Sequence, residues 1–284
     1  MTGFWISGAA VRIIPLSFGR LHTGIDSRQT DGQITLLLAQ QRKLIDDTVS
    51  FIGGCITGVD SSANMISASR TAAESLPNYT VGGKSKINFQ VHDCSTGLPD
   101  SLLDYIPSPK GQRERYTKIF SNAALHWILN PCNSSDFFKD ANRLLENNGY
   151  LVFEMGGRGN VGEVRAALVM ATAKHIGFPA ARAADPWFFP SDDWMRGALE
   201  KARFEVERTE VVQRSSRLEE GAGLEGWVRL MGKAFLAGVG KGEGEEVVRD
   251  VCEALKQVVR DVEGGEEWLQ YVRLRVKAKK VGDV

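Results

Sequence analysis

Short apolar runs alternate with helix-like stretches along the chain from residue 34 onward. The apolar runs are bounded by polar residues and are typical of buried strands; they lie at 55–59, 87–91, 116–120 and 150–153. The stretches between them carry apolar residues at helical spacing, which predicts helices at 34–49, 61–76 and 134–145. This alternation is typical of βαβ units, so it predicts a doubly wound α/β fold with a mostly parallel sheet.

The C-terminal half of the chain continues the pattern with more helices than strands. Helices are predicted at 161–175, 192–202, 223–237 and 245–262, and strands at 204–212 and 269–278. We interpret the basic stretch Lys277-Ala278-Lys279-Lys280 as a solvated tail. The expected organisation is an irregular or atypical N-terminal segment over 1–30 and one domain over 31–284, with helical additions around 161–203 and 223–263.

Composition narrows the classes of function. The 284 residues include 35 basic and 35 acidic side chains, so the formal net charge is zero. Proteins that bind nucleic acid or membrane surfaces usually carry excess positive charge, so we expect a small-molecule substrate and neither of those partners. No apolar run has the length of a membrane-spanning helix. The oligomeric state stays open.

Cysteines and histidines give no sign of a metal site. None of the four cysteines forms a C-x-x-C pair, and the four histidines lack ligand spacing, so we predict no metal. Such cysteines are typical of a reducing compartment, and we expect a cytoplasmic location. A mitochondrial location is the weaker alternative, because the first 25 residues contain Arg12 and Arg20 and no acid before Asp26.

Polar residues follow the predicted strands at the edge where open parallel sheets bind ligands. Asp60 ends the first of these strands, where a carboxylate can accept hydrogen bonds from both hydroxyls of a ribose; the alternative is a helix N-cap. Asp93 follows the next strand, where it can accept from an adenine amine; the alternative is a turn residue before Ser95-Thr96-Gly97.

The stretch Ser121-Asn122-Ala123-Ala124-Leu125-His126-Trp127 is the most distinctive in the chain. Small residues at a strand end let a cofactor approach the backbone. His126 and Trp127 follow at once and are candidates to wall an acceptor pocket. The alternatives are a surface or helix-start position for His126 and a core position for Trp127.

Several motifs resemble class I S-adenosylmethionine (SAM)-dependent methyltransferases, and specifically fungal members of the trans-aconitate methyltransferase-like group. The motifs are 58–66 (GVDSSANMI), 120–127 (FSNAALHW), 143–150 (RLLENNGY), 153–160 (FEMGGRGN) and 185–190 (DPWFFP). The resemblance covers roughly residues 31 to 278. It implies a Rossmann-like, mostly parallel seven-stranded sheet with an antiparallel last strand, and SAM as cofactor.

The resemblance also implies roles for individual residues. The cofactor-binding residues would be Asp31, Gly32, Asp60, Ser61, Met65, Asp93, Cys94 and Asn122. The acceptor site would include Trp127, Arg158 and Trp187, with Arg158 pairing with a carboxylate acceptor. The Trp187-Phe188-Phe189 cluster is equally suited to fixing the added helices on the sheet, and Arg158 to a solvated loop.

The expected reaction is in-line displacement of a methyl group onto an oxygen of a small carboxylate or hydroxyl acceptor. A hydroxyl acceptor needs a proton acceptor, and His126 is the candidate catalytic residue. A nicotinamide-dependent oxidoreductase is disfavoured, because no G-x-G-x-x-G follows a strand and no Tyr-x-x-x-Lys pair is present.

The chain departs from the family at the first strand and its glycine-rich turn, roughly D-x-G-x-G-x-G. Only Asp31-Gly32-Gln33-Ile34-Thr35 matches the end of that motif, and Ser27 to Thr30 replace the preceding glycines. Neither 11–15 nor 21–25 is a clean apolar strand. The alternative to an active enzyme is therefore a catalytically impaired methyltransferase-fold protein without a functional glycine-rich SAM loop.

Overall fold

The computed structural model describes residues 3–7, 56–74, 80–81, 84–85, 87–105, 114–218, 220–240, 242–261 and 265–284. The chain divides into two compact units, and each is treated by itself. The sheet unit comprises Met1–Met155, Asp192–Glu210 and Arg275–Val284. The helical unit comprises Gly156–Ser191 and Val211–Leu274.

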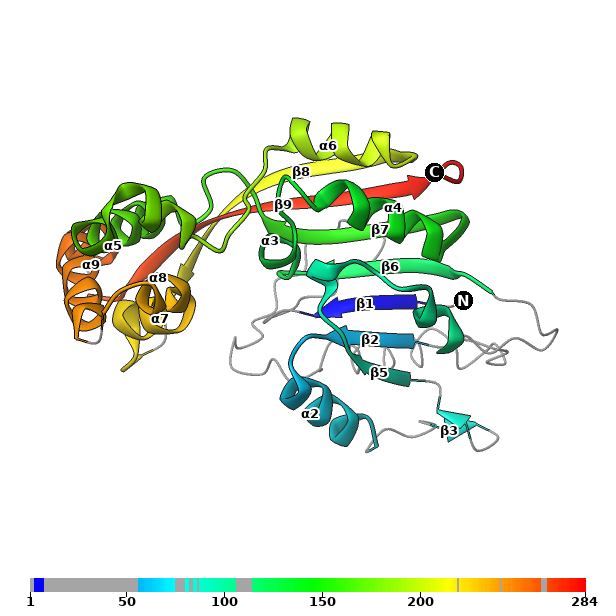
Figure 1. Cartoon of the computed structure of the whole chain (residues 1–284), viewed down its shortest axis with the longest axis horizontal. Coiled ribbons are helices and arrows are strands. Elements are labelled where there is room, and N and C mark those ends of the chain that lie inside the picture. Colours follow the sequence, from blue (N-terminus) through cyan, green and yellow to red (C-terminus); the bar gives the residue numbers. More distant parts are fainter. Residues whose placement is uncertain are drawn as a thin grey trace. The chain divides into compact units, whose positions relative to one another are not determined.

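One sheet has the strand order β5-β2-β1-β6-β7-β9-β8 (Figure 1). Its strands are β5 (Ile87–Val91), β2 (Ile56–Asp60), β1 (Gly3–Ser7), β6 (Tyr116–Asn122), β7 (Leu145–Gly156), β9 (Trp268–Lys280) and β8 (Phe204–Arg217). Neighbours from β5 to β7 pair in parallel, which confirms the predicted mostly parallel α/β fold. The arrow of β9 points opposite to those of β1 and β2 in Figure 1. A separate antiparallel pair joins β3 (Thr80–Val81) and β4 (Lys84–Ser85).

The sheet unit is held by buried side chains on its central strands. Tyr116 and Ile119 of β6 are fully buried. The Tyr116 hydroxyl lies 2.6 Å from the carbonyl oxygen of Leu102 and 2.9 Å from Thr57 Oγ1. The only polar atom of this large side chain is therefore satisfied, which removes most of the cost of burying it.

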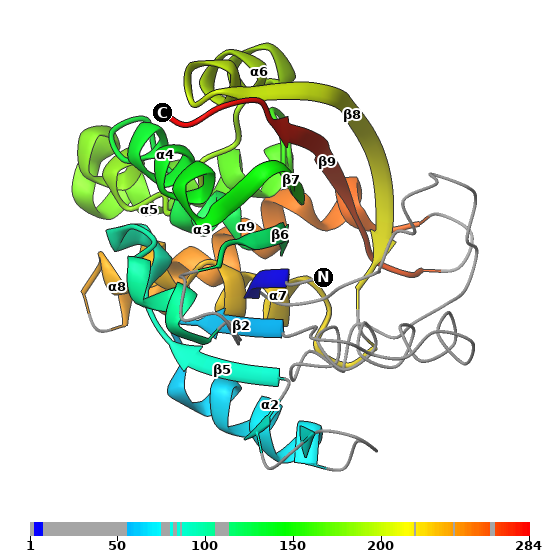
Figure 2. The ribbon, with the colours of Figure 1, turned by 90° about the vertical axis from the view of Figure 1, so that its right-hand side faces the viewer.

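The described part of the sheet unit contains four α-helices, and the first of them has a side-chain cap at its start. They are α2 (Ala63–Glu74), α3 (Leu125–Ile128), α4 (Ser134–Leu144) and α6 (Asp192–Lys201), with the 3₁₀ turns η1 (Cys94–Thr96) and η2 (Asp100–Tyr105). Ser62 Oγ accepts the N–H of Met65 at the start of α2. Phe137 and Phe138 of α4 are buried and meet edge-on. Figure 2 shows α4 against one face of the sheet.

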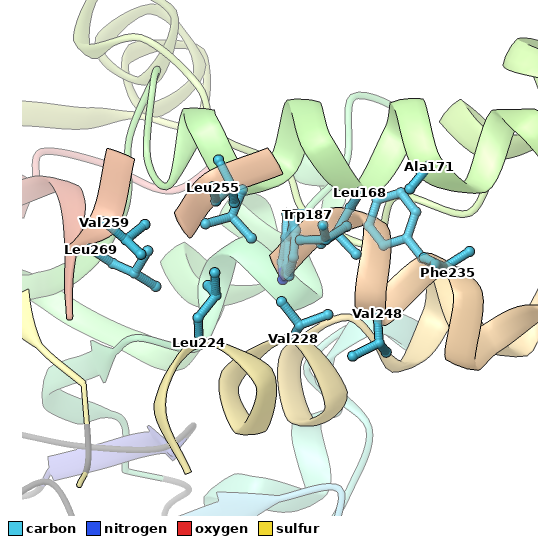
Figure 3. Close-up of a cluster of buried hydrophobic side chains, with 13 residues drawn as sticks. Leu168, Ala171, Trp187, Leu224, Val228, Phe235, Val248, Leu255, Val259 and Leu269 are labelled. Atoms are coloured by element: carbon cyan, nitrogen blue, oxygen red, sulfur yellow. The ribbon is translucent and has the colours of Figure 1, made fainter. Parts of the chain in front are cut away.

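The helical unit has a core of its own, built from α5 (Gly162–Ala183), α7 (Gly223–Met231), α8 (Lys233–Ala237) and α9 (Glu243–Val259). Trp187 lies at its centre, among Leu168, Val228 and Phe235 (Figure 3). Its ring stacks on Phe189 at 6.0 Å between centroids and is tilted against Phe235 at 5.9 Å. Such aromatic pairs add roughly 0.5–1.5 kcal/mol each beyond the area that they bury.

Most predicted elements are present within a few residues of their predicted bounds. Three differ. The helix predicted at 223–237 is divided at Gly232 into α7 and α8. The strand predicted at 150–153 begins at Leu145, directly after α4, with a register irregularity between Tyr116 and Lys118 of its neighbour. The helix predicted at 161–175 extends to Ala183 across a kink at Gly177.

Two expectations about the chain ends need correction. The first strand of the sheet is Gly3–Ser7, inside the segment 1–30 that we expected to be irregular or atypical, and it pairs with β2 and β6. The predicted helix at 34–49 lies outside the described residues. Lys277 to Lys280 belong to β9 and are not a solvated tail; Lys280 is fully buried. Its ammonium donates to the carbonyl oxygens of Asn142 and Leu145, which makes this burial possible.

Candidate functional site

The carboxyl ends of the parallel strands meet at one edge of the sheet. Asp60 at the end of β2 is in register with Val91 at the end of β5, and Ser7 of β1 with Asn122 of β6. Asn122 is in turn in register with Glu154 of β7. Asp60, Asp93 and Asn122 therefore belong to the same edge, where open parallel sheets bind their ligands.

Asp60 has the environment of a carboxylate that can accept from a ligand. It is half-buried, and Oδ1 accepts the N–H of Ser62 at 2.7 Å. Ser62, not Asp60, provides the N-cap oxygen of α2, so the helix-cap alternative for Asp60 does not hold. Burial raises the pKa of Asp60, and the bond from the Ser62 N–H opposes that rise.

Asp93 performs the turn role that we gave as its alternative. Its Oδ1 accepts the N–H of Ser95 at 2.9 Å and caps η1. The hydrogen bonds from Ser95, through its side chain first and its backbone second, lower the pKa of Asp93. Asp93 is exposed, so the cap does not close it off from a ligand.

Cys94, next to Asp93, is a buried thiol. Burial raises its pKa to about 12, and the charges of Asp93 and Asp60 act in the same direction. Cys94 therefore stays protonated and is not a nucleophile. The turn after β5 lies beside the end of β2, because the His92 N–H donates to the Asp60 carbonyl oxygen at 2.9 Å.

The end of β6 is an unusual turn. Ala123 has φ +51°, a left-handed conformation that costs a non-glycine residue about 1 kcal/mol or more. Its N–H donates to the carbonyl oxygen of Glu154 at 2.8 Å, which fixes the turn against β7. Ser121 and Asn122 are buried, and Ser121 Oγ has no hydrogen-bond partner in the described part of the chain. Strained turns of this kind gather at functional sites, and sequence reasoning missed this one.

His126 and Trp127 follow on α3. His126 is 6% exposed and Trp127 is 42% exposed, with 5.6 Å between their ring centroids. His126 has the helix-start position that we gave as an alternative, but it is not at the surface, and the core alternative for Trp127 is wrong. Ser61 is exposed and Met65 is half-buried at the start of α2, beside Asp60 in sequence.

The other two candidates for the acceptor site belong to the helical unit. Arg158 is exposed, and its backbone N–H donates to the carbonyl oxygen of Pro190. Trp187 is 6% exposed in the centre of the helical core. Trp187 therefore packs inside the helical unit and does not form a pocket wall; the alternative that it fixes the added helices on the sheet stays a prediction.

Two cofactor candidates, Asp31 and Gly32, lie outside the described residues. Because β1 ends at Ser7, the partial glycine motif around them is separated from the strand by a long stretch of sequence. The residues that directly follow β1 in the sequence are Gly8, Ala9 and Ala10.

One ion pair at this edge was not predicted. Arg275 Nε on β9 lies 2.6 Å from Glu154 Oε2 near the end of β7, and both side chains are largely buried. A largely buried arginine next to an acid on a neighbouring strand leaves no local signal in the sequence. Among the residues that the structure covers, no group of His, Cys, Asp and Glu is arranged to hold a metal ion. In the same part of the chain, no helix combines the length and apolar character needed to cross a lipid bilayer.

Comparison with known proteins agrees with this arrangement. No family profile matches the chain. It is 32% identical over 234 residues to the uncharacterized methyltransferase C70.08c of Schizosaccharomyces pombe, across 79% of this chain and 78% of that protein.

Two solved structures share the fold. A candidate methyltransferase of Bacillus halodurans (BH2331) superposes with a TM-score of 0.54 at 14% identity, covering 99% of this chain and 93% of that chain. YcgJ of Bacillus subtilis superposes with a TM-score of 0.51 at 9% identity, covering 99% and 92%. The strand order, the acids at the strand ends and the fission yeast relative together show that this chain belongs to the class I SAM-dependent methyltransferases, whose methyl donor is S-adenosylmethionine.

Proposed function

We propose that this chain transfers a methyl group from SAM to an oxygen of a small molecule, either a carboxylate or a hydroxyl, as in the trans-aconitate methyltransferase-like group. The observation that carries the proposal is the half-buried Asp60 carboxylate at the end of β2, beside the ends of β1 and β5. The zero net charge supports a small acceptor over nucleic acid, and we propose a cytoplasmic location on the same compositional grounds as above.

The residues at this edge suit the groups of the cofactor. The ribose of SAM offers two hydroxyl donors, and Asp60 supplies a charged acceptor with a raised pKa and a single described hydrogen bond. The adenine amine is a donor, and Asp93 supplies an exposed carboxylate for it. Ser61 directly follows Asp60 and Met65 lies in the first turn of α2; Cys94 and Asn122 complete the set of proposed contacts. Asp31 and Gly32 remain proposed contacts from the family motif alone.

SAM supplies a methyl group on a positively charged sulfur, which is electrophilic without further activation. The chain's own residues then have three tasks: to orient the two reactants, to exclude water and to accept a proton. His126 is the proposed proton acceptor for a hydroxyl substrate, and its burial limits access by water. Trp127 is the proposed wall of the acceptor pocket, and Arg158 the proposed partner of an acceptor carboxylate. Trp187 is assigned to packing.

A second function is favoured by one specific observation. The sequence contains no D-x-G-x-G-x-G motif, which in this family lets the backbone approach the cofactor. The second candidate is therefore a methyltransferase-fold protein that binds SAM weakly and catalyses no transfer.

Calorimetric titration of the full chain with SAM and with S-adenosylhomocysteine (SAH) tests the proposal. We expect micromolar binding that is lost or weakened at least tenfold in Asp60→Ala. Asp136→Ala is the matched control, because this carboxylate is 77% exposed on α4 and pairs only loosely with Lys139. Binding should then lead to methyl transfer to one of a panel of small carboxylic acids and alcohols, with kcat lowered and SAH affinity retained in His126→Ala. A folded chain that binds neither ligand would refute the enzyme and favour the second function.

A further inference from the structure

The loop from Asp93 to Asp100, which joins β5 to η2, is the segment proposed to contact the adenine ring. It begins beside the ribose acceptor, because the N–H of His92 donates to the Asp60 carbonyl oxygen at 2.9 Å. Its first turn, η1, contains only three residues. A turn this short has little stability of its own, so contacts from elsewhere must hold the remainder of the loop.

Those contacts come from α4, more than 40 positions away in sequence. Asp140 Oδ2 accepts the backbone N–H of Leu98 at 2.9 Å. Arg143 Nη2 donates to the carbonyl oxygen of Leu98 at 2.9 Å. The backbone N–H and C=O of Leu98 are therefore both bound by side chains of α4. Asp140 and Arg143 are three positions apart, so they lie on the same face of that helix.

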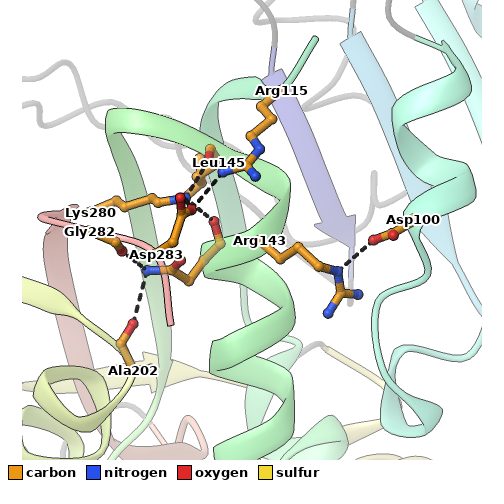
Figure 4. Close-up of polar contacts among 9 residues, drawn as sticks. Asp100, Arg115, Arg143, Leu145, Ala202, Lys280, Gly282 and Asp283 are labelled. Carbon is orange, nitrogen blue, oxygen red and sulfur yellow. Dashed lines mark hydrogen bonds and ion pairs between the residues drawn. The ribbon is translucent and has the colours of Figure 1, made fainter. Parts of the chain in front are cut away.

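Arg143 also bonds two carboxylates, one at the end of the loop and one on its own helix. Its Nε lies 2.5 Å from Asp100 Oδ1 at the end of the loop (Figure 4), and its Nη1 lies 2.7 Å from Asp140 Oδ1. The guanidinium is thus a fork with three acceptors, two of them charged. These bonds raise the pKa of Arg143 further above its ordinary value, with the bond to Asp100 as the largest cause.

The loop packs closely against Asp140 at Gly97, so its backbone has little space for another conformation there. Gly97 has φ +106°, and a Cβ there would stand 2.9 Å from Asp140 Oδ2. His92 Nε2 donates to the Gly97 carbonyl oxygen at 2.8 Å from the other side. Asn133, at the start of α4, donates through Nδ2 to the Ser95 carbonyl oxygen at 3.2 Å. Leu98 itself is 1% exposed, so the core holds its side chain while the polar groups fix its backbone.

We propose that Asp140 and Arg143 are positioning residues for the cofactor: they hold the Asp93–Asp100 loop in the conformation that presents Asp93 and the backbone of Cys94 to the adenine ring. This inference rests on the proposed function. They do not touch the cofactor themselves. When the loop is competent in only a fraction of molecules, the apparent dissociation constant rises by the inverse of that fraction.

The test is calorimetric titration of SAH, and of S-inosylhomocysteine, in which an oxygen replaces the adenine amine. The variants are Arg143→Met and, as a milder change, Asp100→Asn. Arg229→Met is the matched control, since Arg229 also bonds two carboxylates, Glu225 and Glu245, in the helical unit. Thermal unfolding of each variant is recorded in parallel, and the titrations are made well below the lowest midpoint.

We expect SAH to bind about tenfold more weakly to Arg143→Met, which corresponds to a loop that is competent in roughly one molecule in ten. In the same variant, the ratio of the affinities for SAH and S-inosylhomocysteine should decrease, because Asp93 is no longer held in place. Asp100→Asn should change both quantities in the same direction by less, and Arg229→Met should change neither. If Arg143→Met fails to fold, Asp100→Asn decides by the same criteria.

Two results would overturn the inference, and they differ from each other. If the unaltered chain binds SAH and both loop variants bind it equally well with the same preference for adenine, the contacts only stabilise the fold. If the unaltered folded chain binds no SAH, the proposed function fails and the positioning role fails with it.

Discussion

The ring of Phe189 lies against the backbone of Gly156. A Cβ on Gly156 would stand 2.6 Å from Cδ1 of that ring and closer still to Cε1, with Asn160 Nδ2 at 2.9 Å. Gly156 is the last residue of β7, and Phe189 belongs to the loop that Asp185 begins. Asp185 pairs with Arg165 of α5, and the Arg165 guanidinium lies 5.3 Å from the Phe189 ring centroid. The loop is thus fixed at both ends, and the ring has little freedom to move.

Gly156→Ala is therefore expected to destabilise the fold. Overpacking a well-filled site costs typically about 1–3 kcal/mol, and the cost should appear as a lower free energy of unfolding in urea. Gly197→Ala is the control, since a Cβ at Gly197 meets nothing within 4 Å inside α6. That change should stabilise by roughly 0.5–1 kcal/mol through helix propensity. Adding Phe189→Ala to Gly156→Ala should recover part of the loss, and additive effects would contradict the contact.

The buried ammonium of Lys280 should be essential to the sheet unit. Lys280→Met leaves the carbonyl oxygens of Asn142 and Leu145 without their donor, so we expect the free energy of unfolding to fall by about 3 kcal/mol. Lys279→Met, on the same strand with a half-buried side chain, is the control and should cost less than about 1 kcal/mol. Equal losses for the two variants in chemical denaturation would show that Lys280 has no special role.

The ionisation of Asp283 should make the free energy of unfolding depend on pH in the acidic range. Hydrogen bonds from Lys280 first and from Arg115 second lower its pKa from 3.8 to about 2. A carboxyl whose folded pKa lies below its unfolded pKa contributes stability above the unfolded value and loses it as the pH falls through the folded one. Unfolding measured between pH 6 and 2 should therefore show stability falling from about pH 4 downward, less steeply in Asp283→Asn. An unchanged slope in that variant would assign the acid sensitivity to other carboxylates.

The pKa values of the two acids at the strand ends, Asp60 and Asp93, are shifted in opposite directions, so SAH binding should depend on pH through Asp60. Burial raises the pKa of Asp60, whereas hydrogen bonds from Ser95 lower that of Asp93. A ribose acceptor must be ionised, so on acidification SAH binding should weaken first through protonation of Asp60. SAH binding is followed by calorimetry over pH 4–8. The weakening of binding at acidic pH should disappear in Asp60→Asn and remain in Asp93→Asn. The reverse pattern would exchange the roles of the two residues.

Cys94 should resist alkylation in the folded chain. Its pKa of about 12 and its burial leave almost no accessible thiolate at pH 8, whereas Cys132 is exposed. Iodoacetamide labelling followed by peptide mass spectrometry should modify Cys132 within minutes and Cys94 only after denaturation. Comparable rates for the two thiols would contradict the burial of Cys94.

The sequence by itself determined the elements whose chemistry is local. The strand predicted at 87–91 is β5, and the polar residues after the predicted strands, Asp60 and Asp93, lie at one edge of the sheet. Hydrophobic periodicity and turn residues record which segments are buried and where each one ends, so such features can be predicted from a single sequence.

The tertiary structure alone decided which distant groups meet. Gly3–Ser7 contains Phe4, Trp5 and Ile6, which are residue types enriched in strands, but the run is too short to show where it pairs. Its place between β2 and β6 depends on pairing with both neighbours. Lys280 has the composition of a tail residue, but the alternation of side chains along β9 points it inward, where the end of α4 supplies oxygens. Arg143 reaches Leu98 and Asp100 only because α4 packs beside the loop after β5. Long-range pairing of this kind is determined by the packing of whole elements and leaves no periodic trace in the sequence.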